Sequence, residues 1–210
     1  MYRMIRIATY IALALAWLGY FSPWIMPMPV ALRLTGYDLV EWLSFAQGVR
    51  DGTFAVTRVD MVLPLMMIAL LFVTQDLTGL LRPVRSLLIG LALINAFLIL
   101  PSYPFILTAH TDPELRPQLI AGIITFVGVG LIVALSIKRP KWVERIGGGA
   151  AVGGIVFTIR AYALASPVIT DLLTRSVPIG YGIILTISGF VIYFILFAAR
   201  LYGRMRETRV

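Results

Sequence analysis

Two stretches decide the fold: residues 119–137, LIAGIITFVGVGLIVALSI, and residues 179–199, IGYGIILTISGFVIYFILFAA. Neither stretch contains a charged residue. A helix needs about 20 mostly apolar residues to cross the hydrocarbon core of a bilayer. Both stretches meet this requirement, so each predicts a transmembrane helix.

Four further stretches predict transmembrane helices less strongly. Residues 7–26 carry no charge, and we interpret them as a span rather than a cleaved signal peptide. The other three contain polar residues: 61–81 with Asp76, 87–107 with Asn95, and 147–165 with Arg160. The sequence thus predicts an all-α, polytopic membrane protein, in which residues 1–210 form a single integral membrane domain of six transmembrane helices.

The composition supports lipid as the surrounding solvent. Hydrophobic residues make up 60% of the chain and charged residues 13%, whereas soluble domains carry about 25% charged residues. The net charge of +8 comes from a few residues between apolar runs, which does not indicate a nucleic-acid partner. The absence of cysteine excludes disulfides, Cys-ligated zinc and iron–sulfur clusters.

Basic residues gather in alternate connections of the six-span arrangement, whereas most acidic residues fall in the others. Cytoplasmic loops of membrane proteins carry an excess of Lys and Arg. We therefore expect both termini on the cytoplasmic side of the cell membrane. The residues on that side are Arg3, Arg6, Arg82, Arg85, Lys138, Arg139, Lys141, Arg145, Arg200, Arg204, Arg206 and Arg209.

The first outer loop, roughly residues 27–60, contains a short amphipathic helix at about 36–47. Residues 35–38, TGYD, have the form of a capping box with Asp in place of Glu. This helix either staples the loop to the membrane surface or forms a lid or docking surface. In the second interpretation Tyr37, Glu41 and Trp42 are the candidate lid residues. Aromatic Tyr20 and Trp24, just before the loop, are expected at the outer interface.

Three polar residues within the spans are candidate substrate contacts, because polar groups inside a membrane are costly and often functional. Each also has a structural interpretation. Arg160 has Asp60 or Asp171 as an ion-pair partner, Asn95 has a neighbouring helix to bond, and Asp76 has Arg82 or Arg85.

The catalytic and cofactor-binding motifs that we sought are missing. The single histidine, His110, lies in a loop with Asp112 and Glu114, where a solvated turn is expected rather than a metal site. Bis-His haem ligation within the bilayer is therefore impossible. No Walker A, GxSxG or HExxH motif occurs. We expect no enzyme activity, no cofactor and no metal.

Two functions remain. The first is a small substrate-binding or permease subunit of a transport system, working with partner membrane subunits. In size and in its alanine-lined first span the chain is similar to the substrate-capturing subunits of energy-coupling-factor transporters, an analogy of architecture. The alternative is an accessory subunit of a respiratory or photosynthetic membrane complex. A polar-lined cavity between helices, reached by Arg160 or Asn95, favours the first function. A filled interior, with a large apolar face that lipid alone does not explain, favours the second.

Overall fold

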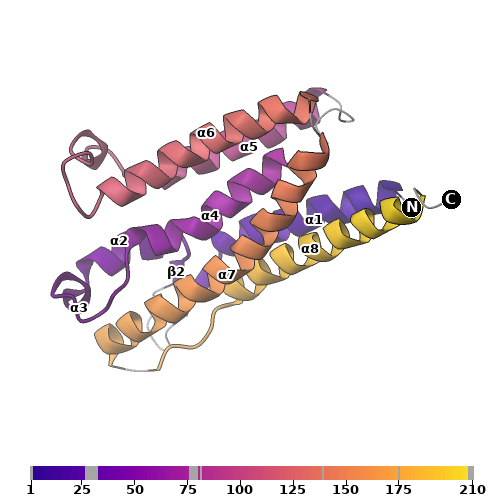
Figure 1. Cartoon of the computed structure of the whole chain (residues 1–210). Coiled ribbons are helices and arrows are strands. Elements are labelled where there is room, and N and C mark those ends of the chain that lie inside the picture. Colours follow the sequence, from indigo (N-terminus) through magenta and orange to yellow (C-terminus); the bar gives the residue numbers. More distant parts are fainter. Residues whose placement is uncertain are drawn as a thin grey trace.

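The computed structural model describes residues 2–26, 33–75, 80, 82–138, 140–174 and 176–207. Within them the chain forms eight α-helices and a two-stranded antiparallel ribbon (Figure 1), which confirms the all-α prediction. In chain order the elements are α1 (Tyr2–Tyr20), β1 (Pro23–Ile25), β2 (Leu34–Thr35), α2 (Asp38–Phe45), α3 (Gln47–Arg50), α4 (Arg58–Val73), α5 (Arg82–Ile99), the 3₁₀-helix η1 (Phe105–Leu107), α6 (Arg116–Lys138), α7 (Pro140–Leu173) and α8 (Tyr181–Glu207).

Four helices, α5 to α8, are each long and apolar enough to cross a membrane. They indicate a multi-pass integral membrane protein in contact with a lipid bilayer. The N-terminal helix is apolar but shorter, with its apolar part at Met4–Tyr20. Helix α4 has 16 residues and carries Arg58 and Asp60 in its first turn. Within the described residues, helix length and composition therefore support four of the six predicted spans.

Several helices end earlier or extend further than predicted. The expected span 61–81 is replaced by α4, where the side chains of Thr74 and Gln75 donate to the carbonyl of Leu71 and satisfy the helix end. The expected span 87–107 begins at Arg82 but stops at Ile99, because Pro101 disfavours helical backbone at the residue before it.

Helix α7 is much longer than the predicted span 147–165. Its 34 residues correspond to about 50 Å, compared with a hydrocarbon core of about 30 Å. The excess length requires a tilted helix or one that extends beyond the core. Figure 1 shows α7 crossing the other helices obliquely, from the end near the α6–α7 connection to the opposite end.

Helix α4 lies at the centre of the bundle. It contacts α1, α2, α5, α6 and α7, and most of its side chains are buried, including Met61, Leu65 and Ile68. A helix that is apolar on all sides is one that other helices surround. The core therefore forms around the helix whose sequence gave one of the weaker transmembrane signals.

Helices α1 and α8 form the closest helix pair, and small residues explain their contact. Ala12 and Ala16 of α1 are buried against Gly189 of α8, where a Cβ atom would collide with the backbone of Ala16. Gly19 likewise lies against the backbone of Thr186. Small residues permit such close approach of helices in membranes. At this surface the alanine stripe of α1 serves internal packing.

The predicted loop helix is present as α2, two residues shorter at each end than 36–47. The reciprocal bonds expected between Thr35 and Asp38 are formed in the turn that leads into α2: Asp38 accepts from the amide and hydroxyl of Thr35, and the Thr35 hydroxyl accepts from the Asp38 amide. In Figure 1, α2, α3 and the α5–α6 connection lie at one end of the bundle, and both chain termini lie at the other.

Candidate functional site

A pocket of about 350 Å³ lies where α2 and α3 meet the start of α4 and the turn before α6. Its volume is at the lower end of the range for small-molecule sites, about 300–1,000 Å³. The lining combines apolar side chains with three charged ones and consists of Leu43, Ser44, Val49, Arg50, Val56, Thr57, Arg58, Val59, Pro113, Glu114 and Pro117. Such a lining suits a small molecule with both apolar and charged parts.

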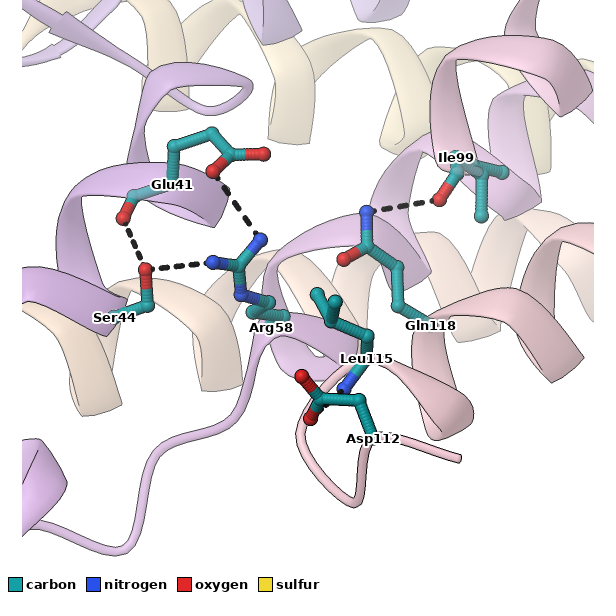
Figure 2. A network of polar contacts seen from close by, with 7 residues as sticks. All are labelled: Glu41, Ser44, Arg58, Ile99, Asp112, Leu115 and Gln118. Atoms are coloured by element: carbon teal, nitrogen blue, oxygen red, sulfur yellow. Dashed lines mark hydrogen bonds and ion pairs between the residues drawn. The ribbon is translucent and has the colours of Figure 1, made fainter. Parts of the chain in front are cut away.

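Arg58, the first residue of α4, holds one wall of the pocket in place. Its Nη1 donates to Glu41 Oε2 at 3.2 Å and its Nη2 to Ser44 Oγ at 2.8 Å (Figure 2). Ser44 Oγ in turn donates to the backbone carbonyl of Glu41 at 2.6 Å. These bonds tie α2 to the N-terminus of α4. Glu41, predicted as a lid residue, therefore supports the pocket by fixing Arg58.

Two buried polar atoms in this region lack a hydrogen-bond partner among the described residues: Arg58 Nε and Gln118 Oε1. The Arg58 side chain is only 14% exposed. Gln118 Nε2 donates to the Ile99 carbonyl at 3.0 Å, and Figure 2 shows its amide oxygen on the side of Arg58. Leaving a buried donor or acceptor unsatisfied costs about 1–3 kcal/mol. This end of the bundle is therefore suited to binding a polar ligand.

Arg50, the last residue of the short helix α3, also lines the pocket. Its Nε donates to the Ser44 carbonyl at 3.3 Å and its Nη2 to the Phe45 carbonyl at 3.1 Å. A cation is favourable at the C-terminal carbonyls of a helix. Arg50 forms no ion pair with a carboxylate among the described residues, so its positive charge is not neutralised there.

The turn before α6 supplies the acidic residue of the pocket. Asp112 Oδ1 accepts from the amides of Glu114 at 2.8 Å and Leu115 at 3.3 Å, which orders this turn. The Glu114 carboxylate lines the pocket and has no hydrogen bond or ion pair to a described residue. Among the described residues, no three His, Asp or Glu side chains gather closely enough to hold a metal ion.

Arg160 lies outside the pocket and is paired. Its Nε donates to Asp60 Oδ1 at 3.0 Å, while Asp60 Oδ2 accepts from the amide and hydroxyl of Thr57 in a second capping box. Asp60 is one of the two partners that the sequence offered for Arg160. The arginine side chain is 59% exposed and is not among the residues that line the pocket.

Asn95 is completely buried and joins two helices. Its Oδ1 accepts from Trp17 Nε1 of α1 at 3.0 Å, and its Nδ2 donates to the Leu91 carbonyl at 2.8 Å. These contacts match the structural interpretation of this residue. Asp76, the third candidate contact within the spans, lies outside the described residues.

The other two lid candidates are placed near the pocket but do not line it. The ring of Tyr37 lies 6.0 Å from the ring of Phe21, and partial burial raises the pKa of the Tyr37 hydroxyl. Trp42 is 37% exposed on α2. Of the three residues, only Glu41 bonds to a residue of the pocket wall.

Sequence reasoning missed Arg50, Arg58 and Glu114, which supply the charges of the pocket. Arg58 falls within the predicted first outer loop, roughly residues 27–60. The pattern Thr57-x-x-Asp60 is a capping box, and its recognition would have placed Arg58 in the first turn of a helix. For the contact of this turn with residues 113–117 the sequence carries no signal.

The arrangement offers charged and apolar surfaces for binding. Comparison of the chain with protein-family models, with curated proteins and with solved structures gives no match.

Proposed function

We propose that the chain is a non-catalytic, membrane-embedded subunit of a transport system, which binds a small substrate and works with partner membrane subunits. The observation that carries this proposal is the pocket beneath α2 and α3. It has the volume of a small-molecule site, and its wall includes a nearly buried arginine held by Glu41 and Ser44. A chain that served only to fill space beside other subunits would have no need of such a pocket.

A six-span topology is part of the proposal. Helices α1 and α4 would cross the membrane together with the four longer helices. Support comes from the position of both chain termini at one end of the bundle, as an even number of crossings requires (Figure 1). Arg82 begins α5 at that end, and Arg200 lies near the end of α8. An excess of basic residues marks the cytoplasmic side, so the pocket would face outward.

The test is a ligand screen on the purified protein, combined with identification of its partners. The full chain, purified in mild detergent, should gain thermal stability with at least one class of small molecule. Arg58→Gln should abolish that gain, whereas Arg33→Gln, an exposed arginine that does not line the pocket, should leave it intact. Mass spectrometry should find ATPase or other transport subunits that co-purify.

The accessory-subunit function remains the second candidate, because two polar residues of the spans are already satisfied within the fold. Asn95 is bonded to Trp17, and Arg160 is paired with Asp60. Neither side chain is free to bind a substrate between the helices. Co-purification of redox subunits, together with no stabilisation by any small molecule, would favour this function over transport.

A further inference from the structure

We propose that the pocket binds a zwitterion, a small molecule with one acidic group, one ammonium group and an apolar body. The inference rests on the proposed function, because it names the class of substrate for the same pocket. It is carried by three features of the lining: the balance of its charges, the presence of two guanidinium groups and its apolar surface.

Apart from Arg58, which is paired with Glu41, the pocket is lined by one positive charge, Arg50, and one negative charge, Glu114. Glu41 neutralises Arg58 at 3.2 Å. Arg50 bonds only to backbone carbonyls and keeps its positive charge, while the Glu114 carboxylate has no partner among the described residues. A simple anion would pair with Arg50 but be repelled by Glu114. A simple cation would pair with Glu114 but be repelled by Arg50. A zwitterion satisfies both.

Arg58 places a second guanidinium group in the wall of the same pocket. Arg58 Nε is buried and has no partner among the described residues, although Arg58 forms part of the pocket wall. A carboxylate or phosphate accepts more than one hydrogen bond, and bonds from guanidinium groups to such acceptors are among the strongest in proteins. We therefore place the acidic group between Arg50 and Arg58, and the ammonium group at Glu114.

The remaining lining is apolar and fixes the character of the ligand body. It consists of Leu43, Val49, Val56, Val59, Pro113 and Pro117. The volume of about 350 Å³ corresponds to roughly twelve water molecules at about 30 Å³ each. A free amino acid with an aliphatic side chain, such as leucine, fits this description. The head group of a zwitterionic lipid such as phosphatidylethanolamine has the same pair of charges.

The experiment measures the affinity of the full chain in detergent for leucine and for analogues that lack one charge. Isocaproate lacks the ammonium group and isopentylamine lacks the carboxylate. Both should bind at least about tenfold more weakly than leucine, because each leaves one charged group without its partner. A short-chain phosphatidylethanolamine forms a separate arm. Tighter binding in that arm would identify the lipid as the source of the zwitterion.

Charge-removing variants test which residue recognises which group. Arg50→Gln should weaken leucine binding about tenfold and leave isopentylamine binding unchanged. Glu114→Gln should weaken leucine binding to a similar extent and leave isocaproate unchanged. Arg50→Lys retains the charge and should retain most of the affinity. Arg33→Gln and Asp171→Asn, two exposed residues that do not line the pocket, serve as controls.

Failure of this inference differs from failure of the proposed function. If isocaproate binds as tightly as leucine and Glu114→Gln has no effect, the pocket is an anion site, and the zwitterion assignment is wrong while a transport role stands. If neither leucine nor the lipid binds the wild-type chain, the zwitterion assignment is also wrong. Transport itself is overturned only if no class of small molecule binds and no transport subunit co-purifies.

Discussion

Asp60 uses its two carboxylate oxygens for different purposes. One caps the N-terminus of α4 through Thr57, and the other binds Arg160. We predict that Asp60→Ala lowers the free energy of unfolding by about 1–2 kcal/mol, mainly through loss of the cap. Arg160→Gln should cost less, at most about 1 kcal/mol, because the arginine is 59% exposed. Unfolding in mild detergent measures both, and equal losses would contradict this division of roles.

Asn95 is expected to contribute to stability rather than to substrate binding. Asn95→Ala removes the acceptor of Trp17 Nε1 and should destabilise the protein by about 1–3 kcal/mol. Trp17→Phe removes the same bond from the other side. A double-mutant cycle, which compares the double variant with both single ones, should show positive coupling between the two residues. If Asn95→Ala instead lost ligand binding at unchanged stability, Asn95 would be a substrate contact after all.

The sequence predicted the ion-pair partner of Arg160 better than it predicted which aromatic side chains are buried. It offered Asp60 as a partner for Arg160, since an unpaired charge within a span is costly. It placed Tyr20 and Trp24 at the outer interface, whereas both are completely buried and Trp24 Nε1 donates to the Gly19 carbonyl. Position along a span indicates depth in the membrane, but it does not indicate which side of the helix faces protein.

Among the elements, α4 shows why apolar length is an incomplete guide to the fold. Lipid-facing helices need long uncharged stretches, and α6 and α8 meet that rule clearly. Helix α4 is surrounded by other helices, so its charged first turn finds partners in Glu41 and Arg160. The sequence predicted that a helix existed near residues 61–81, but its start at Arg58 and its central position depended on tertiary contacts.

Two glycines provide a matched test of the α1–α8 contact. A Cβ atom at Gly189 would collide with the backbone of Ala12 and Ala16, whereas a Cβ at Gly90 of α5 would have no atom within 4 Å. Gly189→Ala should therefore destabilise the protein, by about 1–3 kcal/mol as for overpacked cores. Gly90→Ala should stabilise it by roughly 0.5–1 kcal/mol, since alanine favours the helix. Comparable thermal stability for the two variants would show that this helix pair can separate at little cost.

At the scale of the whole molecule, the pocket joins segments that are distant in the sequence. Leu43 to Val59 come from the first outer loop and the start of α4, while Pro113, Glu114 and Pro117 come from the connection after α5. Hydrophobic periodicity reports on single elements, so it could predict the helices of this site but not their meeting.

The six-span topology is tested best at α1 and α4, because these two helices are shorter than the four that are long enough to cross a membrane. The chain contains no cysteine, so a single introduced cysteine is its only thiol. We predict that a membrane-impermeant maleimide labels Thr53→Cys in intact cells. Met4→Cys and Pro83→Cys, at the other end of the bundle, should react only after permeabilisation; all three positions are exposed.

Each pair of positions isolates one helix. Met4 lies in the first turn of α1 and Thr53 lies after α1 and before α4, while Pro83 lies after α4, in the first turn of α5. Thr111→Cys, which is exposed beyond the long helix α5, should be labelled in intact cells and serves as the control for the outer side. If Thr53→Cys requires permeabilisation while Thr111→Cys does not, neither short helix crosses the membrane. The pocket, formed by residues on both sides of such an arrangement, could then not exist as described, so this labelling pattern would also overturn the outward-facing site.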